Sequence, residues 1–399
     1  MRPVTVTCLA PDEVSETAPQ GGWAVAEFFA GIGLVRMGLE SSAFRVVWSN
    51  DIDPSKQQMY DSHFGRSEDH QFVRMDIASV QGSELPPGLS LAWASFPCID
   101  LSLAGWRRGL HGEDSGTFWQ FVRILDELGD SKPPVVTLEN VAGLATSRQG
   151  RDLEAVARAL NELGYSLDIL MLDARRFVPQ SRPRLFIVGA REPGSANPAQ
   201  GNDVLRPEAL RRIFEDPALR THRWPLPPPP TSLQDGLTLL VERLEKSDAR
   251  WWDGPRTGAF LESLSPLQRT RLEALRSQNL VSFRTAYRRT RSGKAVWEIR
   301  PDDLSGCLRT ARGGSSKQAL VEAGHGEVRL RWMTPREYAR LMGADDYRLD
   351  GIRRNQALCG FGDAVCVPVV NWLAQHYLAP LVTQQQSSSH KALAQAAIG

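Results

Sequence analysis

The sequence contains few cysteines, and their spacing excludes the common metal and disulfide frameworks. The five cysteines are an odd number and lie far apart, at Cys8, Cys98, Cys307, Cys359 and Cys366. None belongs to a Cys-x-x-Cys pair or stands at a zinc-type spacing from a histidine. A structural zinc site or a disulfide scaffold would need such spacings. We therefore expect a reducing compartment and no structural metal.

The chain also lacks long apolar runs and a strong net charge. No apolar run reaches the roughly 18 residues of a membrane span, and the first residues show no basic segment followed by an apolar one. The net charge is only +1, which by itself points to no class of partner. These absences predict a cytoplasmic protein without a membrane anchor.

The length and apolar content allow a substantial core. With 399 residues, 42% of them hydrophobic, the chain can form two domains or one large domain with an insert. Residues 1–21 lack periodicity and are expected to form a flexible leader. A Gln- and Ser-rich stretch begins at residue 384, so a disordered tail is expected over 381–399.

A strand-and-helix pattern begins at residue 23. Residues 23–29 are apolar and of strand length, a turn follows with Gly31 and Gly33, and residues 34–40 begin a helix. Glycines let the backbone approach a ligand closely, and the free N–H groups of a helix start favour a polar or anionic group. A plain strand-to-helix turn is the alternative for so short a motif.

Acidic residues end the next two expected strands. The strand over 44–53 carries Asp51 near its end, and the strand over 71–75 is followed by Asp76. In nucleotide-binding α/β folds, a carboxylate at the end of the second strand binds ribose hydroxyls. The first three strand ends thus carry a glycine turn, Asp51 and Asp76. This set indicates a ligand that contains a nucleoside, with Asp51 as its ribose contact.

The fourth expected strand, over 89–94, leads to a cysteine that follows a proline. Cys98 comes directly after Pro97, and the segment 99–116 beyond it is rich in glycine and contains two arginines and a histidine. A thiol at a strand end, followed by a flexible basic segment, suits catalysis beneath a closing loop. The alternative is that Cys98 is a buried packing residue.

A carboxylate and two arginines follow further along the chain. A helix over 117–128 and a strand over 134–138 place Glu139 at the end of a buried strand. Burial would raise the pKa of Glu139, as a proton donor to a ring nitrogen requires, whereas a solvated loop glutamate is the alternative. Arg182 and Arg184 stand two residues apart on an extended segment, so both would point to one face and could clamp a phosphate or a base edge.

Residues 191–327 lose the regular alternation of strands and helices and become basic. Between 284 and 317 nine Lys and Arg residues stand against three acidic residues, a local net charge of +6, and Tyr287 and Trp297 lie among them. Basic residues interleaved with aromatics are typical of a surface that contacts a phosphate backbone, and a solvated basic face is the alternative. The candidates for DNA contact are Arg288, Arg289, Arg291, Arg309 and Arg312.

The order of these motifs resembles that of the DNA (cytosine-5) methyltransferases. The similarity covers about 23–190 and 328–380. The matching pieces, in chain order, are Phe29 to Gly33, Asp51 to Asp53, Asp76 with Ile77, Pro97 with Cys98, Glu139 to Val141, Gln180 to Arg184, Arg331 to Gly343 and Gly360 to Val365.

The resemblance implies an α/β fold. It is a Rossmann-like, doubly wound, mostly parallel sheet of the type found in methyltransferases that depend on S-adenosylmethionine. The catalytic domain would span 22–190 and return over 328–380 with the last two motifs. A smaller target-recognition domain would be inserted over 191–327, and it would choose the DNA sequence.

The resemblance also implies a reaction on cytosine flipped out of duplex DNA. Cys98 would attack C6 while Glu139 protonates N3, and C5 would take a methyl group from S-adenosylmethionine. Arg182 and Arg184 would favour the thiolate, and Asn140 would hold the loop around the catalytic pair. The cofactor would be bound by Phe29, Gly31, Gly33, Asp51, Ile52, Asp76, Ile77, Pro97, Ala364 and Val365. The loop after the cysteine would add Ser102, Arg107 and Arg108 to the DNA contacts.

Two positions depart from the family pattern. Ile99 stands where the family usually has a glutamine that fills the space left by the flipped base. Asp363 replaces a common asparagine near the methionine end of the cofactor. By family analogy the enzyme would belong to a bacterial restriction–modification or phage-defence system. Other components of that system would be its partners, and it would be associated with the nucleoid in the cytosol.

Three other functions would share some of these sequence features. An RNA cytosine methyltransferase would share the catalytic plan, but the large basic insert disfavours it. A non-catalytic DNA-binding regulator is disfavoured because Cys98, Glu139 and both arginines are present. A nicotinamide-dependent oxidoreductase, which the glycine turn alone would allow, leaves Cys98 and the basic insert unexplained.

Overall fold

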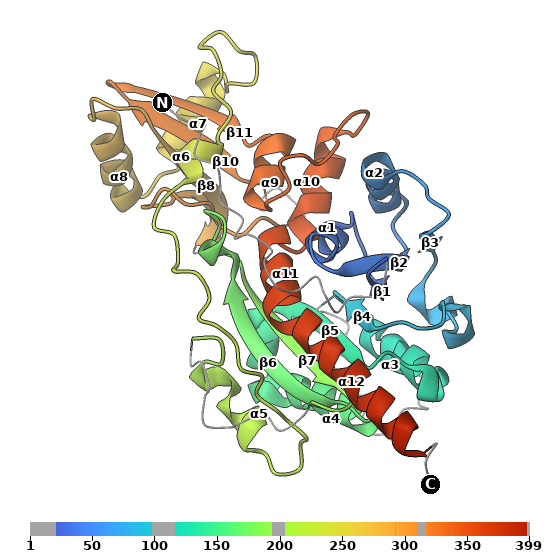
Figure 1. Cartoon of the computed structure of the whole chain (residues 1–399). Coiled ribbons are helices and arrows are strands. Elements are labelled where there is room, and N and C mark those ends of the chain that lie inside the picture. The colour runs from blue at the N-terminus through green and yellow to red at the C-terminus, as the bar shows by residue number, and fades with distance from the viewer. Residues whose placement is uncertain (1–20, 98–115, 194–203, 292, 310–316, 397–399) are drawn as a thin grey trace.

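In the part of the chain that the structure describes, the larger of two β-sheets has seven strands, in the order β3-β2-β1-β4-β5-β7-β6 (Figure 1). Strands β1 to β5 pair in parallel, whereas β7 runs antiparallel to both β5 and β6. The predicted α/β fold with a mostly parallel sheet is therefore confirmed. The strands are β1 (Trp23–Phe28), β2 (Phe44–Asp51), β3 (Gln71–Arg74), β4 (Leu91–Ala94), β5 (Val135–Val141), β6 (Ser166–Asp173) and β7 (Pro183–Ala190).

The structure is a computed structural model that describes residues 21–97, 116–193, 204–291, 293–309 and 317–396. The predicted leader lies outside these residues except for its last position, Gly21. Among the predicted site residues, the same holds for Cys98, Ser102, Arg107, Arg108 and Arg312.

Helices cover both faces of the large sheet (Figure 1). Successive strand residues point to opposite faces, so Val25 belongs to one hydrophobic core and Ala26 to the other. This two-sided burial explains why the central strands read as continuous apolar runs. The face of Ala26 carries α3 (Thr117–Glu127) and α4 (Arg151–Glu162). The face of Val25 carries α1 (Leu34–Glu40), α2 (Pro54–Phe64), α9 (Pro335–Leu341), α10 (Arg354–Asp363) and α11 (Val367–Leu373).

The chain returns to the first strand's unit near its C-terminus, in residues 367–378. Helix α11 packs on α1 so closely that a Cβ atom at Gly38 would lie 2.5 Å from Cβ of Val370. The helix continues through a π-helical turn, Ala374–Leu378, into α12 (Ala379–Ala396). This arrangement joins the last motif to the first.

The disordered tail predicted over 381–399 is wrong for the part that the structure describes. Leu381 and Val382 in α12 are fully buried. Gln385 accepts the backbone N–H of Glu192 at 3.0 Å. These residues continue the apolar helical spacing of α11, and their contacts on the sheet outweigh the low-complexity composition that follows them.

One described stretch, Arg354–Ser387, is long and apolar enough to cross a membrane. However, 67% of its most apolar window is buried inside the protein. Its apolar residues therefore supply the core of the fold.

The segment after β7 still packs on the large sheet, so the predicted boundary at 190 does not coincide with an end of packing. Arg206 forms an ion pair with the fully buried Asp168 of β6, at 2.5 Å between Nη2 and Oδ2. Tyr377 donates to the same carboxylate at 2.9 Å, and His222 bonds the Tyr377 hydroxyl at 3.1 Å. This network ties residues 204–222 and the C-terminal helix to the sheet edge.

A second, four-stranded antiparallel sheet forms the smaller part of the molecule, in the order β11-β10-β8-β9. Contrary to the irregular insert expected from the sequence, this part is regular, and it extends past 327 because β11 ends at Trp332. The buried residues Phe283 and Ala286 of β8 stand among arginines, so this stretch reads as a basic segment and not as an apolar strand. Its elements are α6 (Leu237–Leu240), α7 (Gly254–Glu262), α8 (Pro266–Arg276), β8 (Ser282–Arg291), β9 (Lys294–Ile299), β10 (Ala319–Gly324) and β11 (Glu327–Trp332).

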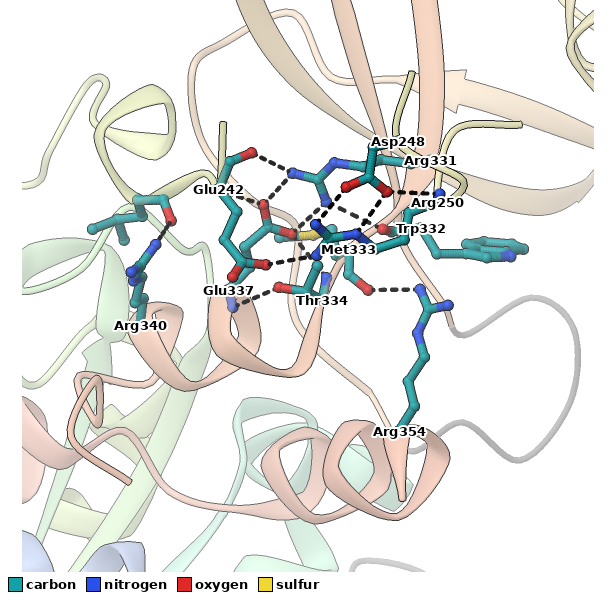
Figure 2. Close-up of polar contacts among 11 residues, drawn as sticks. Glu242, Asp248, Arg250, Arg331, Trp332, Met333, Thr334, Glu337, Arg340 and Arg354 are labelled. Carbon is teal, nitrogen blue, oxygen red and sulfur yellow. Dashed lines mark hydrogen bonds and ion pairs between the residues drawn. The ribbon is translucent and has the colours of Figure 1, made fainter. Parts of the chain in front are cut away.

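A buried polar junction connects β11 to α9 and so joins the two sheets (Figure 2). Arg331 is 0% exposed and Glu337 is 1% exposed. Their side chains make two hydrogen bonds, 2.8 Å from Nη1 to Oε2 and 2.5 Å from Nη2 to Oε1. Glu337 also accepts the backbone N–H groups of Thr334 at 2.8 Å and Glu242 at 2.9 Å. The junction thus sets the second sheet against the helices that cover the first.

Candidate functional site

One cavity of about 1350 Å³ collects most of the predicted site residues. It opens where the parallel strands β1 to β5 end, because the carboxyl ends of parallel strands meet at one edge of a sheet. Its opposite wall comes from the second sheet. The predicted residues that line it are Phe29, Gly31, Asp51, Ile52, Asp76, Ile77, Pro97, Glu139, Asn140, Arg182, Arg184, Arg288, Arg289, Arg291, Arg309, Ala364 and Val365.

The turn after β1 is held by the carboxylate of Asp51. Gly31, at φ 59°, donates its N–H to Asp51 Oδ2 at 2.9 Å, and Asp53 donates its N–H to Oδ1 at 2.9 Å. Each carboxylate oxygen can accept more than one hydrogen bond, so Asp51 retains capacity for ligand hydroxyls. Its place is fixed by the backbone before any ligand arrives.

Gly33, predicted to contact a cofactor, does not line this cavity. It has φ 82°, and a Cβ atom there would lie 2.4 Å from the ring of Phe64 and 2.7 Å from that of Tyr60. Glycine is required at this position for the packing of α1 on α2. The second glycine of the motif is therefore explained without a ligand.

Apolar and acidic groups alternate around the same end of the cavity. Asp76 accepts the backbone N–H of Ala78 at 2.9 Å, which holds its carboxylate at the rim. Ile52 is 62% exposed, an unusual exposure for isoleucine. With Phe29 and Ile77 it offers apolar surface between carboxylates. A planar heterocycle attached to a sugar fits this set of donors, acceptors and apolar faces.

Glu139 forms the other end of the cavity. It lies within β5, paired to Phe186 of β7, and is 7% exposed. Arg184 Nε contacts its Oε1 at 3.0 Å. Burial raises the pKa of Glu139 above its ordinary value, although the guanidinium groups of Arg184 and Arg182 lower it in part. The site therefore holds a buried carboxyl group that binds its proton more tightly than a solvated glutamate does.

Asn140 ties the end of β5 to the end of β4. Its side-chain Nδ2 donates to the carbonyl of Phe96 at 2.9 Å, and its Oδ1 accepts the N–H of Val141 at 2.9 Å. Pro97, the last described residue before Cys98, lines the cavity. The end of the segment after β4, at Phe96, is thus anchored from the neighbouring strand.

Arg182 does not form a clamp with Arg184, contrary to the prediction. Its side chain is 1% exposed and donates to the carbonyls of Leu308 at 2.7 Å, Gly362 at 3.0 Å and Ala364 at 2.6 Å. Two of these carbonyls lie at the end of α10, where helical carbonyls lack internal donors. Arg182 therefore braces three segments, and only Arg184 contacts Glu139.

The basic strand β8 faces the cavity from the second sheet. Arg291 and Arg289 both pair with Glu298 of β9, at 2.7 Å and 3.3 Å. Arg288 lies over the ring of Trp297, 5.9 Å from its centroid. The predicted candidates for DNA contact that the structure describes therefore converge on the cavity that holds Glu139.

Several residues of the cavity were missed from the sequence. Lys56 lies in the first turn of α2, where a positive charge opposes the helix dipole, and this was the one available signal. Cys307 has its Sγ 3.5 Å from Arg182 and 3.9 Å from Arg184, in a segment without any recognisable pattern. Ser95 hydrogen-bonds Glu139 and precedes the predicted motif by two residues.

Known proteins resemble this chain over most of its length. A family model described as C-5 cytosine-specific DNA methylase matches residues 23–378. The Type II methyltransferase M.Bsp6I of Bacillus sp. is 26% identical and covers 88% of this chain and 97% of its own length. The Type II methyltransferase M.DsaV of Dactylococcopsis salina is 28% identical and covers 92% of this chain and 89% of its own length. The crystal structure of the Dnmt2 methyltransferase of S. pombe, 16% identical, shares the fold with a TM-score of 0.57 over 90% of this chain and 99% of its own.

Proposed function

The chain belongs to the C-5 cytosine-specific DNA methylase family, and from this premise we propose that it methylates C5 of cytosine within one specific duplex sequence, using S-adenosylmethionine. The observation that carries the proposal is that one cavity brings these groups together. It contains the buried Glu139 beside Arg184 at one end, Asp51 and Asp76 at the other, and the basic strand β8 opposite. Base, cofactor and DNA backbone would meet in that space.

The cofactor site would use the carboxylates to recognise an adenosine group. Asp51 would accept hydrogen bonds from ribose hydroxyls and Asp76 from the adenine amino group, while Phe29, Ile52 and Ile77 would pack on the ring. S-adenosylmethionine, when bound, supplies an electrophilic methyl group. The geometry around Asp51 supports this role because two backbone N–H groups hold its oxygens toward the cavity.

The chain's own groups would perform the remaining steps on the base. A cytosine in a duplex cannot be reached, so it would rotate out of the stack into the cavity. The Cys98 sulfur would add to C6 while protonated Glu139 donates to N3, which makes C5 nucleophilic. After C5 has gained the methyl group it would lose its proton, and the C6–S bond would break to release the thiolate. Arg184 would orient Glu139, and Asn140 would hold the end of β4 in place.

Residues of the second sheet would choose the sequence. Similarity to Type II methyltransferases over 97% and 89% of their lengths supports a role as the modification enzyme of a restriction–modification or phage-defence system. The proposal is tested with labelled S-adenosylmethionine and either duplex DNA or transfer RNA, followed by bisulfite sequencing of the DNA. We expect label in DNA only, at cytosines in one short context. Label in RNA alone would overturn it.

Cys98→Ser is expected to abolish methyl transfer and to leave DNA binding intact, because a hydroxyl is a far weaker nucleophile than a thiolate. Duplex DNA containing 5-fluorocytosine blocks the loss of the C5 substituent, so the wild-type enzyme should form an adduct that survives denaturation. The variant should form none. Cys307→Ser is the matched control and should still form the adduct. Near-normal turnover by Cys98→Ser would contradict the covalent mechanism.

Arg288→Ala is expected to weaken binding to all duplexes alike if Arg288 contacts a phosphate. Each phosphate contact releases counterions, so the slope of log K against log salt concentration should fall by about one. An arginine that reads a base would instead cost about 1–3 kcal/mol on the preferred site only. Fluorescence anisotropy at several salt concentrations separates the two. Arg211→Ala, on an exposed helix away from the cavity, should change neither quantity.

A further inference from the structure

A lysine and an aspartate from distant parts of the chain meet at the edge of the main cavity. Lys56 of α2 and Asp363 at the end of α10 form an ion pair, with Nζ 3.3 Å from Oδ2. Both residues line the main cavity and also a second cavity of about 570 Å³ beside it. The pair therefore separates two open cavities. A contact that only stabilised the core would be enclosed by other side chains.

Helix stability does not explain Lys56. Its position in the first turn of α2 is electrostatically unfavourable, since the N-terminal end of a helix carries partial positive charge. Burial lowers the pKa of Lys56, but nearby carboxylates outweigh this effect and raise the pKa above its ordinary value. Those carboxylates are Asp51, Asp363 and Asp53. Lys56 is thus kept charged where acidic groups surround it.

The pair lies between the two ends of the cavity. On one side, Lys56 is close enough to Asp51, the proposed ribose contact, to feel its charge. On the other side, the carbonyls of Gly362 and Ala364, which flank Asp363, are bonded to Arg182 at 3.0 Å and 2.6 Å. Arg182 is in turn close enough to Glu139 to affect its pKa. A nucleoside cofactor that extended from Asp51 toward Glu139 would therefore pass beside the ion pair of Lys56 and Asp363.

We propose that Lys56 and Asp363 bind the amino-acid end of S-adenosylmethionine. Lys56 would donate to the carboxylate of this zwitterionic group, and Asp363 would accept from its α-ammonium group. The inference rests on the proposed cofactor and deepens it. The ion pair is complementary in charge to the ligand. The protein places an ammonium beside a carboxylate, and the amino-acid end of the ligand also carries one ammonium and one carboxylate. Binding would exchange one ion pair for two and leave the site neutral, so no unpaired charge would be buried.

The test compares two ligands that differ only in the part recognised. S-adenosylhomocysteine carries the amino-acid end, and 5′-methylthioadenosine lacks it while keeping the nucleoside and the sulfur. Hydrogen bonds to charged groups are strong enough that Lys56→Met should weaken S-adenosylhomocysteine binding about 10-fold to 100-fold in titration calorimetry. Asp363→Asn should weaken it less, because the amide oxygen still accepts a hydrogen bond. Binding of 5′-methylthioadenosine should change less than about twofold in both variants.

A matched control lies two residues beyond the end of the same helix. Arg66 pairs with Asp61 of α2 at 3.5 Å, away from both cavities, so Arg66→Met should alter binding of neither ligand. Equal losses for both ligands in Lys56→Met would mean that the pair only shapes the pocket, and no loss for either would mean that it does not touch the cofactor. Either result overturns the assignment. If the wild-type protein bound neither ligand, the proposed cofactor itself would be wrong.

Discussion

Glu139→Gln is expected to slow methyl transfer about 10²-fold to 10⁴-fold, the range that a positioned acid or base contributes. Glutamine has nearly the same shape and can still hydrogen-bond a ring nitrogen, but it cannot transfer a proton to it. The amide oxygen of glutamine can still accept a hydrogen bond from Arg184 in the same buried position, so the fold should tolerate the change. Single-turnover kinetics with a saturating duplex would measure the methylation step without product release.

The pH dependence of the same step follows from the direction of the pKa shift. Burial raises the pKa of Glu139 above its ordinary value, so the active protonated form persists to higher pH than for a solvated glutamate. The rate should fall as pH rises through that raised pKa. The folded state also binds this proton more tightly than the unfolded state does. The resulting stability is fully present below the unfolded pKa of about 4.3 and is lost as pH rises through the folded pKa.

A matched control for Glu139 stands in the same sheet, on a strand separated from β5 by β4. Glu27 in β1 is 1% exposed, and burial likewise raises its pKa. It does not line the cavity. Glu27→Gln should therefore leave the single-turnover rate nearly unchanged. If Glu139→Gln behaved in the same way, the proton-donating role would have to be abandoned.

Arg331→Met is expected to lower the free energy of unfolding by about 3–5 kcal/mol, the usual cost of removing one partner from a buried ion pair. Glu337 would remain almost fully buried with its charge uncompensated, although two backbone N–H groups would still reach it. Urea unfolding followed by circular dichroism and tryptophan fluorescence would measure the change. Because the junction joins the two sheets and tryptophans lie in both, the fluorescence transition should move to lower urea concentration.

Two further variants show whether charge or shape accounts for this loss. Arg331→Met combined with Glu337→Leu replaces the pair with apolar groups of similar volume and should recover much of the stability. Arg45→Met removes an exposed partner, paired with Asp69 at 3.8 Å, and should leave unfolding almost unchanged. A double variant no more stable than Arg331→Met alone would contradict the ion-pair explanation.

Much of the catalytic sheet and of its site was predictable from local pattern. Strands and helices of the first unit follow apolar periodicity, which depends only on neighbouring residues. Parallel strands bring their carboxyl ends to one edge, so acids at the ends of β2 and β3 and Glu139 near the end of β5 had to approach one another. Asp51, Asp76 and Glu139 could be named for that reason alone.

Contacts between distant segments could not be predicted in this way. Arg182 was expected to face a ligand beside Arg184, yet it donates to carbonyls 126 to 182 residues away. The end of α10 needed donors for its free carbonyls, and nothing near Arg182 in the chain indicates that need. The pair of Lys56 and Asp363 arises likewise, because the last motif folds back beside the first.

The amino-acid order alone therefore determined the strand–turn–helix units, the acids at their ends and the sequence of motifs, since all of these follow from spacing along the chain. The folded chain decided which groups are buried, paired or free to meet a ligand. It made Gly33 a packing residue, converted the Gln- and Ser-rich end into helix α12, and placed the basic end of β8 beside the main cavity. The physical reason is that burial and ion pairing depend on distance in space, which topology sets and local sequence does not.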